Sequence, residues 1–188
     1  MPRDALAEEA LPRELAEVRF SRLYQEHEGE ILRYALRRSE EPEDAADVVA
    51  ETFLVAWRRL GDVPLGEEAR LWLYATARRV LANQKRGVTR RTRLAERLRQ
   101  ELRRQLPAPA PGERGEVLEA LAAMREGDRE LLMLVGMEEL TPAQAARVLG
   151  ISTVAARTRL HRARRRLRAR LAEGEREMGP EEMEVEAR

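Results

Sequence analysis

Eight arginines fall between positions 157 and 170, and no acidic residue lies among them. A guanidinium donates paired hydrogen bonds to a phosphate or to the edge of a guanine, so this segment could bind nucleic acid. On an isolated helix these like charges would repel one another, and we therefore expect an anionic partner. The eight are Arg157, Arg159, Arg162, Arg164, Arg165, Arg166, Arg168 and Arg170.

The residues that precede this cluster predict a helix-turn-helix. Thr141 and Gln144 have the spacing of a capping box at the start of a short helix. Gly150 provides the left-handed residue that a tight turn needs, and Ser152 is expected to cap the second helix. The buried stripe of that second helix is expected to consist of Leu160, Ala163 and Leu167.

The composition restricts the class of protein. The chain has 188 residues, of which 43% are hydrophobic and only 4% aromatic, which favours helices over sheets. The absence of cysteine excludes a disulfide framework and a thiolate metal site. His27 and His161 lie far apart, and no nucleophile or phosphate-loop motif accompanies them, so we expect no enzyme, cofactor or metal site.

Helical periodicity and turn residues divide the chain into parts. Helices are predicted over about 18–38, 43–60 and 67–85, with Pro42 starting the second and Gly87 ending the third. The stretch LPAPAPGERG, residues 106–115, is typical of an extended linker. We expect an all-α fold with two small helical domains joined by a flexible Pro/Ala-rich linker. The predicted parts are a polar extension (1–18), an amino-terminal domain (19–92), a basic segment and linker (93–115), a carboxy-terminal domain (116–172) and a disordered acidic tail (173–188).

An acidic edge is predicted on the second helix. Asp44, Asp47 and Glu51 are spaced by three and four residues, so they share one side of that helix. Val48, Phe53 and Trp57 are expected on its other side. Taken alone, this segment is an ordinary amphipathic helix with a hydrated acidic edge.

Two aromatic residues, Trp72 and Tyr74, precede a polar and basic run on the third predicted helix. Aromatic rings can stack on unpaired bases while nearby cations hold the backbone. Residues two apart lie on different faces of a helix, so at least one ring is expected in the core, and we favour Trp72 as the structural one. The candidate DNA contacts of the run are Arg78, Arg79, Asn83, Lys85 and Arg86.

Three segments of the chain resemble a known family. DAADVVAETFLVAWRRL (44–60) and ARLWLYATARRVLANQKRGVTRR (69–91) resemble the central part of the extracytoplasmic-function (ECF) sigma factors of bacterial RNA polymerase. GISTVAARTRLHRARRRLR (150–168) resembles the end of that family's carboxy-terminal domain. The resemblance covers roughly 20–172 and implies binding to core polymerase, recognition of the minus-10 and minus-35 promoter elements, and help in melting the start site.

The resemblance also implies roles for individual residues. The residues expected to dock on the clamp helices of the largest polymerase subunit are Asp44, Asp47, Val48, Glu51 and Phe53. The residues expected at the minus-10 element are Trp72, Tyr74, Arg78, Arg79, Asn83, Lys85 and Arg86. The residues expected at the minus-35 element are Ser152, Thr153, Arg157, Thr158, Arg159, His161 and Arg162. An anti-sigma factor is a further candidate partner. A cytoplasmic location without membrane insertion is expected, because no apolar run approaches 18 residues.

Some positions depart from the family pattern. Val154, Ala155 and Ala156 stand where Gly-Thr-Val is common, Arg79 where Asn is frequent, and Ala50 where Gln is frequent. Two alternatives therefore stay open beside the promoter-reading sigma factor. One is a free-standing helix-turn-helix regulator, which leaves the 44–91 motifs unexplained. The other is a degenerate sigma-like protein that binds polymerase or a partner and no longer reads promoters.

Overall fold

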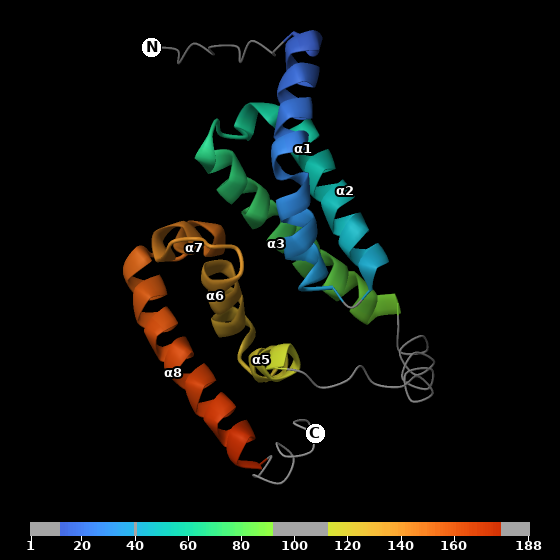
Figure 1. Ribbon diagram of the computed structural model, residues 1–188. Coiled ribbons are helices and arrows are strands. Elements are labelled where there is room, and N and C mark those ends of the chain that lie inside the picture. The colour runs from blue at the N-terminus through green and yellow to red at the C-terminus, as the bar shows by residue number, and fades with distance from the viewer. Residues whose placement is uncertain (1–11, 40, 92–112, 178–188) are drawn as a thin grey trace, which may run out of the picture. The chain divides into compact units, whose positions relative to one another are not determined.

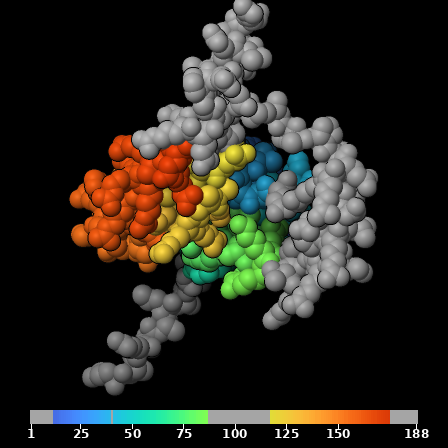
Figure 2. All heavy atoms as spheres, turned by 90° about the horizontal axis from the view of Figure 1, so that it is seen from below, coloured from blue at the N-terminus to red at the C-terminus, as the bar shows by residue number. Residues whose placement is uncertain are grey.

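The computed structural model describes residues 12–39, 41–91 and 113–177, and all of its regular elements in these stretches are helices (Figure 1). The chain divides into two compact units, 1–91 and 92–188. The predicted all-α fold with two helical domains is confirmed. Figure 2 shows the chain in space-filling form from another side, with α8 in orange to red at the surface of the second unit.

The first unit consists of three packed helices. They are α1 (Arg13–Leu36), α2 (Pro42–Arg58) and α3 (Glu67–Arg91), with a short 3-10 helix η1 (Leu60–Asp62) before α3. Ile31, Val48 and Leu73 contribute one fully buried side chain from each helix. The rings of Tyr34 and Tyr74 pack with their centroids 5.2 Å apart and join α1 to α3. Each helix therefore has one apolar side committed to a common core.

The limits of these helices differ from the sequence prediction at two places. Pro42 occupies the first turn of α2 as expected. Gly87, however, does not end the third helix, which continues to Arg91. One glycine costs a helix only about 1 kcal/mol, and here the helix continues through it. Residues 13–18, which were expected in a polar extension, belong to α1.

The second unit has four helices, α5 (Glu113–Ala122), α6 (Glu126–Gly136), α7 (Pro142–Leu149) and α8 (Thr153–Glu177). The longest, α8, packs against the other three. Its Ala163 is fully buried in a cluster with Leu121, Met124 and Met133 from α5, the turn after it, and α6. This cluster fixes the side that α8 turns away from solvent.

The helix-turn-helix forms as the sequence predicted. The Thr141 hydroxyl accepts a hydrogen bond from the Gln144 backbone at 3.2 Å, and the Gln144 side chain accepts one from the Thr141 backbone at 2.8 Å. Gly150 has φ +68°, a conformation that only glycine adopts without strain. The Ser152 hydroxyl accepts from the Ala155 backbone N–H at 3.1 Å and caps α8. Both ends of the turn are thus fixed by local hydrogen bonds.

The outer limits of the second unit also differ from the prediction. Residues 113–115 were assigned to the linker, but α5 begins at Glu113. Residues 173–177 were assigned to the acidic tail, but α8 continues to Glu177. The rest of the predicted linker and of the tail, like residues 1–11, lies outside the described residues.

Candidate nucleic-acid interface

The arginine-bearing helix α8 has one buried side and an exposed remainder. Ala156, Leu160 and Ala163 are buried, and Leu167 packs half-buried against the same cluster. The predicted buried stripe is therefore confirmed and begins one turn earlier, at Ala156. At about 100° per residue, the arginines fall on two flanks of this stripe and on the outward face opposite it.

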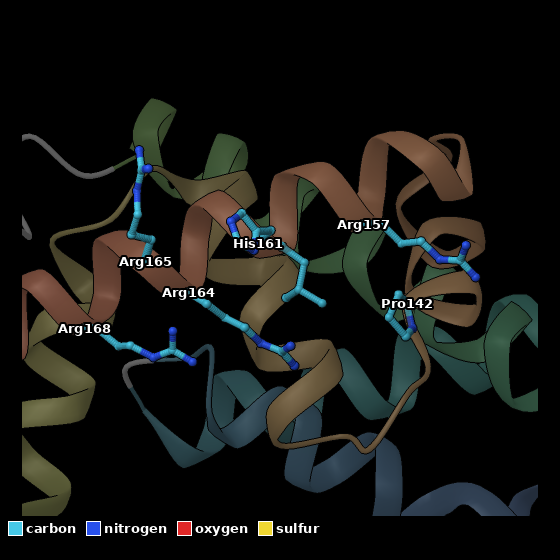
Figure 3. A pocket seen from close by; sticks show the side chains of 7 residues that line it. Pro142, Arg157, His161, Arg164, Arg165 and Arg168 are labelled. Carbon is cyan, nitrogen blue, oxygen red and sulfur yellow. The ribbon is translucent and has the colours of Figure 1, made fainter.

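One flank of α8 forms a cationic hollow with the start of α7. A cavity of about 390 Å³ lies there, as Figure 3 shows from close by. Arg164 and Arg168 extend to one side in this view, and Arg165 points the opposite way. The seven lining residues are Pro142, Arg157, Leu160, His161, Arg164, Arg165 and Arg168. With four arginines and no carboxylate in its lining, this hollow suits an anionic ligand such as a phosphate backbone.

The opposite flank of α8 is tied to α6. Asp128, in the first turn of α6, is buried, and its two carboxylate oxygens accept from Arg159 Nε at 2.7 Å and Arg166 Nη1 at 2.6 Å. Sequence reasoning placed Arg159 in the DNA contact and missed Asp128. No local sequence pattern indicates this pairing, because Asp128 is 31 and 38 positions away from its two arginine partners.

The outward face of α8 carries the other predicted minus-35 residues. Thr158 and Arg162 are exposed four residues apart, one turn after Val154, which is 74% exposed. Thr153 is half-buried at the start of the helix. The Ser152 hydroxyl is engaged as the cap. The residues with the freest approach to a DNA groove are therefore Thr158 and Arg162.

The structure covers one of the two aromatic residues on α3 and leaves the other partly exposed. Tyr74 is buried, with 1% of its surface exposed, and packs on Tyr34, so its ring cannot stack on a base. Trp72, which was favoured as structural, is half-buried. The two side chains lie on different faces of the helix, as the sequence analysis expected, but only the position of α1 decides which ring is covered.

The polar and basic run of α3 is exposed. Arg78, Arg79, Asn83, Lys85 and Arg86 all lie at the surface. Arg86 Nη2 donates to Asn83 Oδ1 at 2.6 Å, and Arg86 Nε donates to the Ala82 carbonyl at 3.2 Å. Trp72, Arg79, Asn83 and Arg86 recur at spacings of seven, four and three, which places the indole ring on the same side as three polar residues. An aromatic and cationic surface of this kind suits unpaired bases.

The acidic edge of α2 is exposed, but its apolar neighbours are not. Asp44, Asp47 and Glu51 are all solvent-facing along one side. Val48 and Phe53, also expected to touch polymerase, are buried in the core, with the Phe53 ring 4.8 Å from that of Tyr24. Both therefore support the helix from inside and cannot contact a partner in this fold.

An apolar contribution to the α2 surface was missed by the sequence analysis. Leu54 is 40% exposed and lies three residues after Glu51. Trp57 is 39% exposed, although its ring packs edge-on against Phe20 with centroids 5.2 Å apart. The helical spacing predicted Trp57 on the buried side. Its indole is wide enough to contact the core and still reach the surface.

The described part of the chain offers neither a metal site nor a membrane span. Within it, no three His, Cys, Asp or Glu residues gather closely enough to hold a metal ion. None of the described helices has the length and apolarity needed to cross a bilayer.

The two units match two family models. Residues 23–91 match sigma-70 region 2, and residues 114–167 match sigma-70 region 4. The chain is 32% identical over 157 residues to the ECF RNA polymerase sigma factor SigL of Mycobacterium tuberculosis strain H37Rv, a match that covers 80% of this chain and 88% of SigL. It is 33% identical over 169 residues to the RNA polymerase sigma factor CnrH of Cupriavidus metallidurans, covering 81% and 86%.

Solved structures agree with these matches. The structure of CnrH in complex with the cytosolic domain of CnrY has a TM-score of 0.56 and 30% identity, and the match covers 85% of this chain and 96% of CnrH. Sigma factor RpoE from Bartonella quintana, solved with the anti-sigma factor NepR, has a TM-score of 0.60 at 22% identity, covering 81% and 96%. This second likeness supports the fold. With both regions matched in order and SigL and CnrH similar over most of their length, the chain belongs to the ECF sigma factors of bacterial RNA polymerase and directs transcription initiation.

Proposed function

We propose that three surfaces of this sigma factor divide the work of initiation. The exposed acidic edge of α2 binds core polymerase, the Trp72 side of α3 binds the melted minus-10 strand, and α8 reads the minus-35 element. The observation that carries the proposal is the cationic hollow on α8, with four arginines and no carboxylate in its lining. The protein then acts in the cytoplasm by binding alone, and we assign it no catalytic residue.

The outward face of α8 is proposed to read base edges. Arg162 can form two hydrogen bonds with a guanine, and the Thr158 methyl and hydroxyl groups can contact an adjacent base. Arg157 and His161 border the hollow on the amino-terminal half of the helix, where a groove-inserted helix meets the bases. Arg168 lies further along the helix and is proposed to contact a phosphate of the DNA backbone.

Substitution of Arg162 by alanine is expected to relax promoter preference at one or two minus-35 positions. Loss of a bidentate contact to guanine costs about 1 to 3 kcal/mol of discrimination. The measurement is binding of the full chain to a set of single-base minus-35 variants. Arg168→Ala is the matched control, and it should weaken all variants equally while the log–log salt slope falls by about 0.9. If Arg162→Ala also weakens binding to every minus-35 variant by the same factor, α8 does not read sequence through this residue.

The Trp72 side of α3 is proposed to hold bases that have left the duplex. The half-buried indole has one covered and one open part, as a stacking platform requires. Arg79 and Asn83 follow it on the same side of the helix, where a guanidinium can hold phosphate and an amide can pair with a base edge. Tyr74 supports this surface from the core.

Replacement of Trp72 by alanine is expected to slow opening of the promoter. Stacking on an aromatic ring contributes about 1 to 3 kcal/mol per base. Initiation from double-stranded promoter should therefore fall more than initiation from a promoter already opened by mismatches. Trp72→Phe should restore most of the loss, because a ring remains. Trp57→Ala, at the other partly exposed indole, is the control and should lower initiation from the two templates by the same factor. A larger fall on the double-stranded promoter for Trp57→Ala as well would contradict the assignment.

An anti-sigma factor is proposed as a further partner class. The support comes from relatives, since RpoE was solved with the anti-sigma factor NepR and CnrH with the cytosolic domain of CnrY. Co-purification from cells that express a tagged chain would identify such a protein.

Reconstitution tests the whole proposal. The purified chain and core polymerase are combined with genomic fragments, and specific transcripts are mapped. A sigma factor produces transcripts that start at fixed sites and need both components. A free-standing regulator, which the region 2 match at 23–91 already disfavours, would bind a palindrome as a dimer without polymerase. Polymerase binding without specific transcripts would indicate a degenerate sigma-like protein.

A further inference from the structure

Three charged side chains link the first turn of α6 to α8. Both carboxylate oxygens of Asp128 are used, one by Arg159 at 2.7 Å and one by Arg166 at 2.6 Å. The Asp128 side chain is 6% exposed, whereas those of the two arginines are 43% and 54% exposed. A buried carboxylate is costly without cationic partners, so Asp128 favours conformations in which both arginines stay with it.

The two arginines lie on one side of α8. They are seven residues apart, which corresponds to two helical turns. Relative to Leu160 they project toward α6, whereas Arg157 and Arg164 project toward the hollow on the other flank. Asp128 therefore binds Arg159 and Arg166 on the α6 side of the helix and makes no contact with Arg157 and Arg164 on the side of the hollow.

A glycine next to Asp128 makes room for this arrangement. A Cβ atom placed on Gly127 would lie 3.0 Å from Arg159 Cζ and 3.2 Å from Arg159 Nη1. These distances are too short for ordinary contact, so any other residue at position 127 would push the guanidinium aside. Gly127 has no positive φ that would call for glycine, since the glycines with positive φ in the described residues are Gly66 and Gly150. The close approach of Arg159 is what its missing side chain accommodates.

We propose that Asp128 is a positioning residue that withholds Arg159 and Arg166 from DNA. The inference rests on the proposed binding of DNA by α8. An arginine that reaches phosphate adds affinity for every sequence, because the backbone charge is the same everywhere. A helical segment with eight arginines and no carboxylate, such as 157–170 of α8, therefore tends toward indiscriminate binding. Asp128 keeps two of those charges against α6, and the outward residues Thr158 and Arg162 then determine a larger share of the binding.

The decisive variant is Asp128→Asn, which keeps the size of the side chain and removes its charge. For a duplex of scrambled sequence, the full chain should bind more tightly at low salt, and the log–log salt slope should steepen by up to about 1.8, or about 0.9 for each released arginine. Preference for the minus-35 duplex over the scrambled one should fall. Glu126→Gln is the matched control, because it removes the same charge from an exposed position in the same helical turn. It should leave the slope unchanged.

Three further variants separate positioning from a merely structural role. Gly127→Ala alters no charge and favours the helix, but its methyl group crowds the Arg159 guanidinium against Asp128, so the salt slope should steepen by up to about 0.9. Arg159→Gln in the native background should leave the slope unchanged, because that arginine does not reach phosphate. Adding Arg159→Gln and Arg166→Gln to Asp128→Asn should return the slope to the native value.

The possible outcomes are distinct. If Asp128→Asn and Gly127→Ala leave the slope for scrambled DNA unchanged, or if Arg159→Gln alone lowers it by about 0.9, the inference is overturned. If Asp128→Asn loses the circular dichroism of a helical protein, the salt slopes of Gly127→Ala and Arg159→Gln test the inference in its place. If the native chain shows no preference between the two duplexes, it is the proposed role of α8 that fails, whatever the Asp128 variants do.

Discussion

Reversal of charge at Asp47 and Glu51 to lysine is expected to weaken binding to core polymerase by roughly 10- to 100-fold. Opposed like charges cost an interface several kcal/mol, and each 1.4 kcal/mol corresponds to about a factor of ten. Folding should not change, because both side chains are exposed on α2 and exposed substitutions usually alter stability by about 0.5 kcal/mol or less. The measurement is titration of labelled core polymerase with the variant chain, at two salt concentrations.

A matched control separates docking from net charge. Glu26→Lys with Glu67→Lys makes the same change of four charges at exposed positions on α1 and α3. This control should bind polymerase nearly as tightly as the native chain. Leu54→Ala tests the apolar part of the same surface and should weaken binding without salt dependence. Equal affinities for the α2 variant and the control would remove the acidic edge as the docking site.

Truncation of Leu131 to alanine is expected to unfold much of the second unit. The Leu131 side chain is fully buried in α6, and such a change costs about 2 to 5 kcal/mol. A unit of this size has a total stability of only about 3 to 10 kcal/mol. Binding to the minus-35 element should therefore be lost at physiological temperature, although α6 contributes no proposed base contact.

The placement of the tryptophans gives this experiment two separate signals. Both tryptophans, Trp57 and Trp72, belong to the first unit. In a urea titration of Leu131→Ala, the fluorescence transition should stay where it is in the native chain, while part of the far-ultraviolet circular dichroism transition moves to lower urea. Leu118→Ala, the same change at a half-exposed position on α5, should have a much smaller effect. A shared shift of both signals would show that the two units unfold together.

Sequence patterns predicted the features that are determined over a few residues. The capping box of Thr141 and Gln144, the turn at Gly150 and the cap at Ser152 were all correct, because each depends on hydrogen bonds within one helical turn. Pro42 marked the start of α2 because proline fits the first helical turn, where its missing N–H leaves no hydrogen bond unmade. The order of the helices and their assignment to two domains followed from such local signals.

Features that depend on packing between helices could not be predicted in the same way. Whether Trp72 or Tyr74 faces the core depends on Tyr34, about 40 residues earlier in the chain. Val48 and Phe53 were assigned to the polymerase-binding surface together with their acidic neighbours in the motif, although both side chains are buried. The pairing of Asp128 with Arg159 spans 31 residues and has no local periodicity. Each of these errors concerns orientation and not the type of element.

The solvent-facing side of α8 has an evolutionary consequence. Ala156, Leu160 and Ala163 pack this helix against the core, and Ser152 caps it. The exposed Val154 contributes little to the stability of the fold. Substitutions among exposed residues cost little stability, so selection for a folded protein barely constrains that side. Promoter preference can therefore drift between lineages while the scaffold stays the same. A library randomised at outward positions such as Val154 should be rich in folded proteins that differ in the sequences they choose.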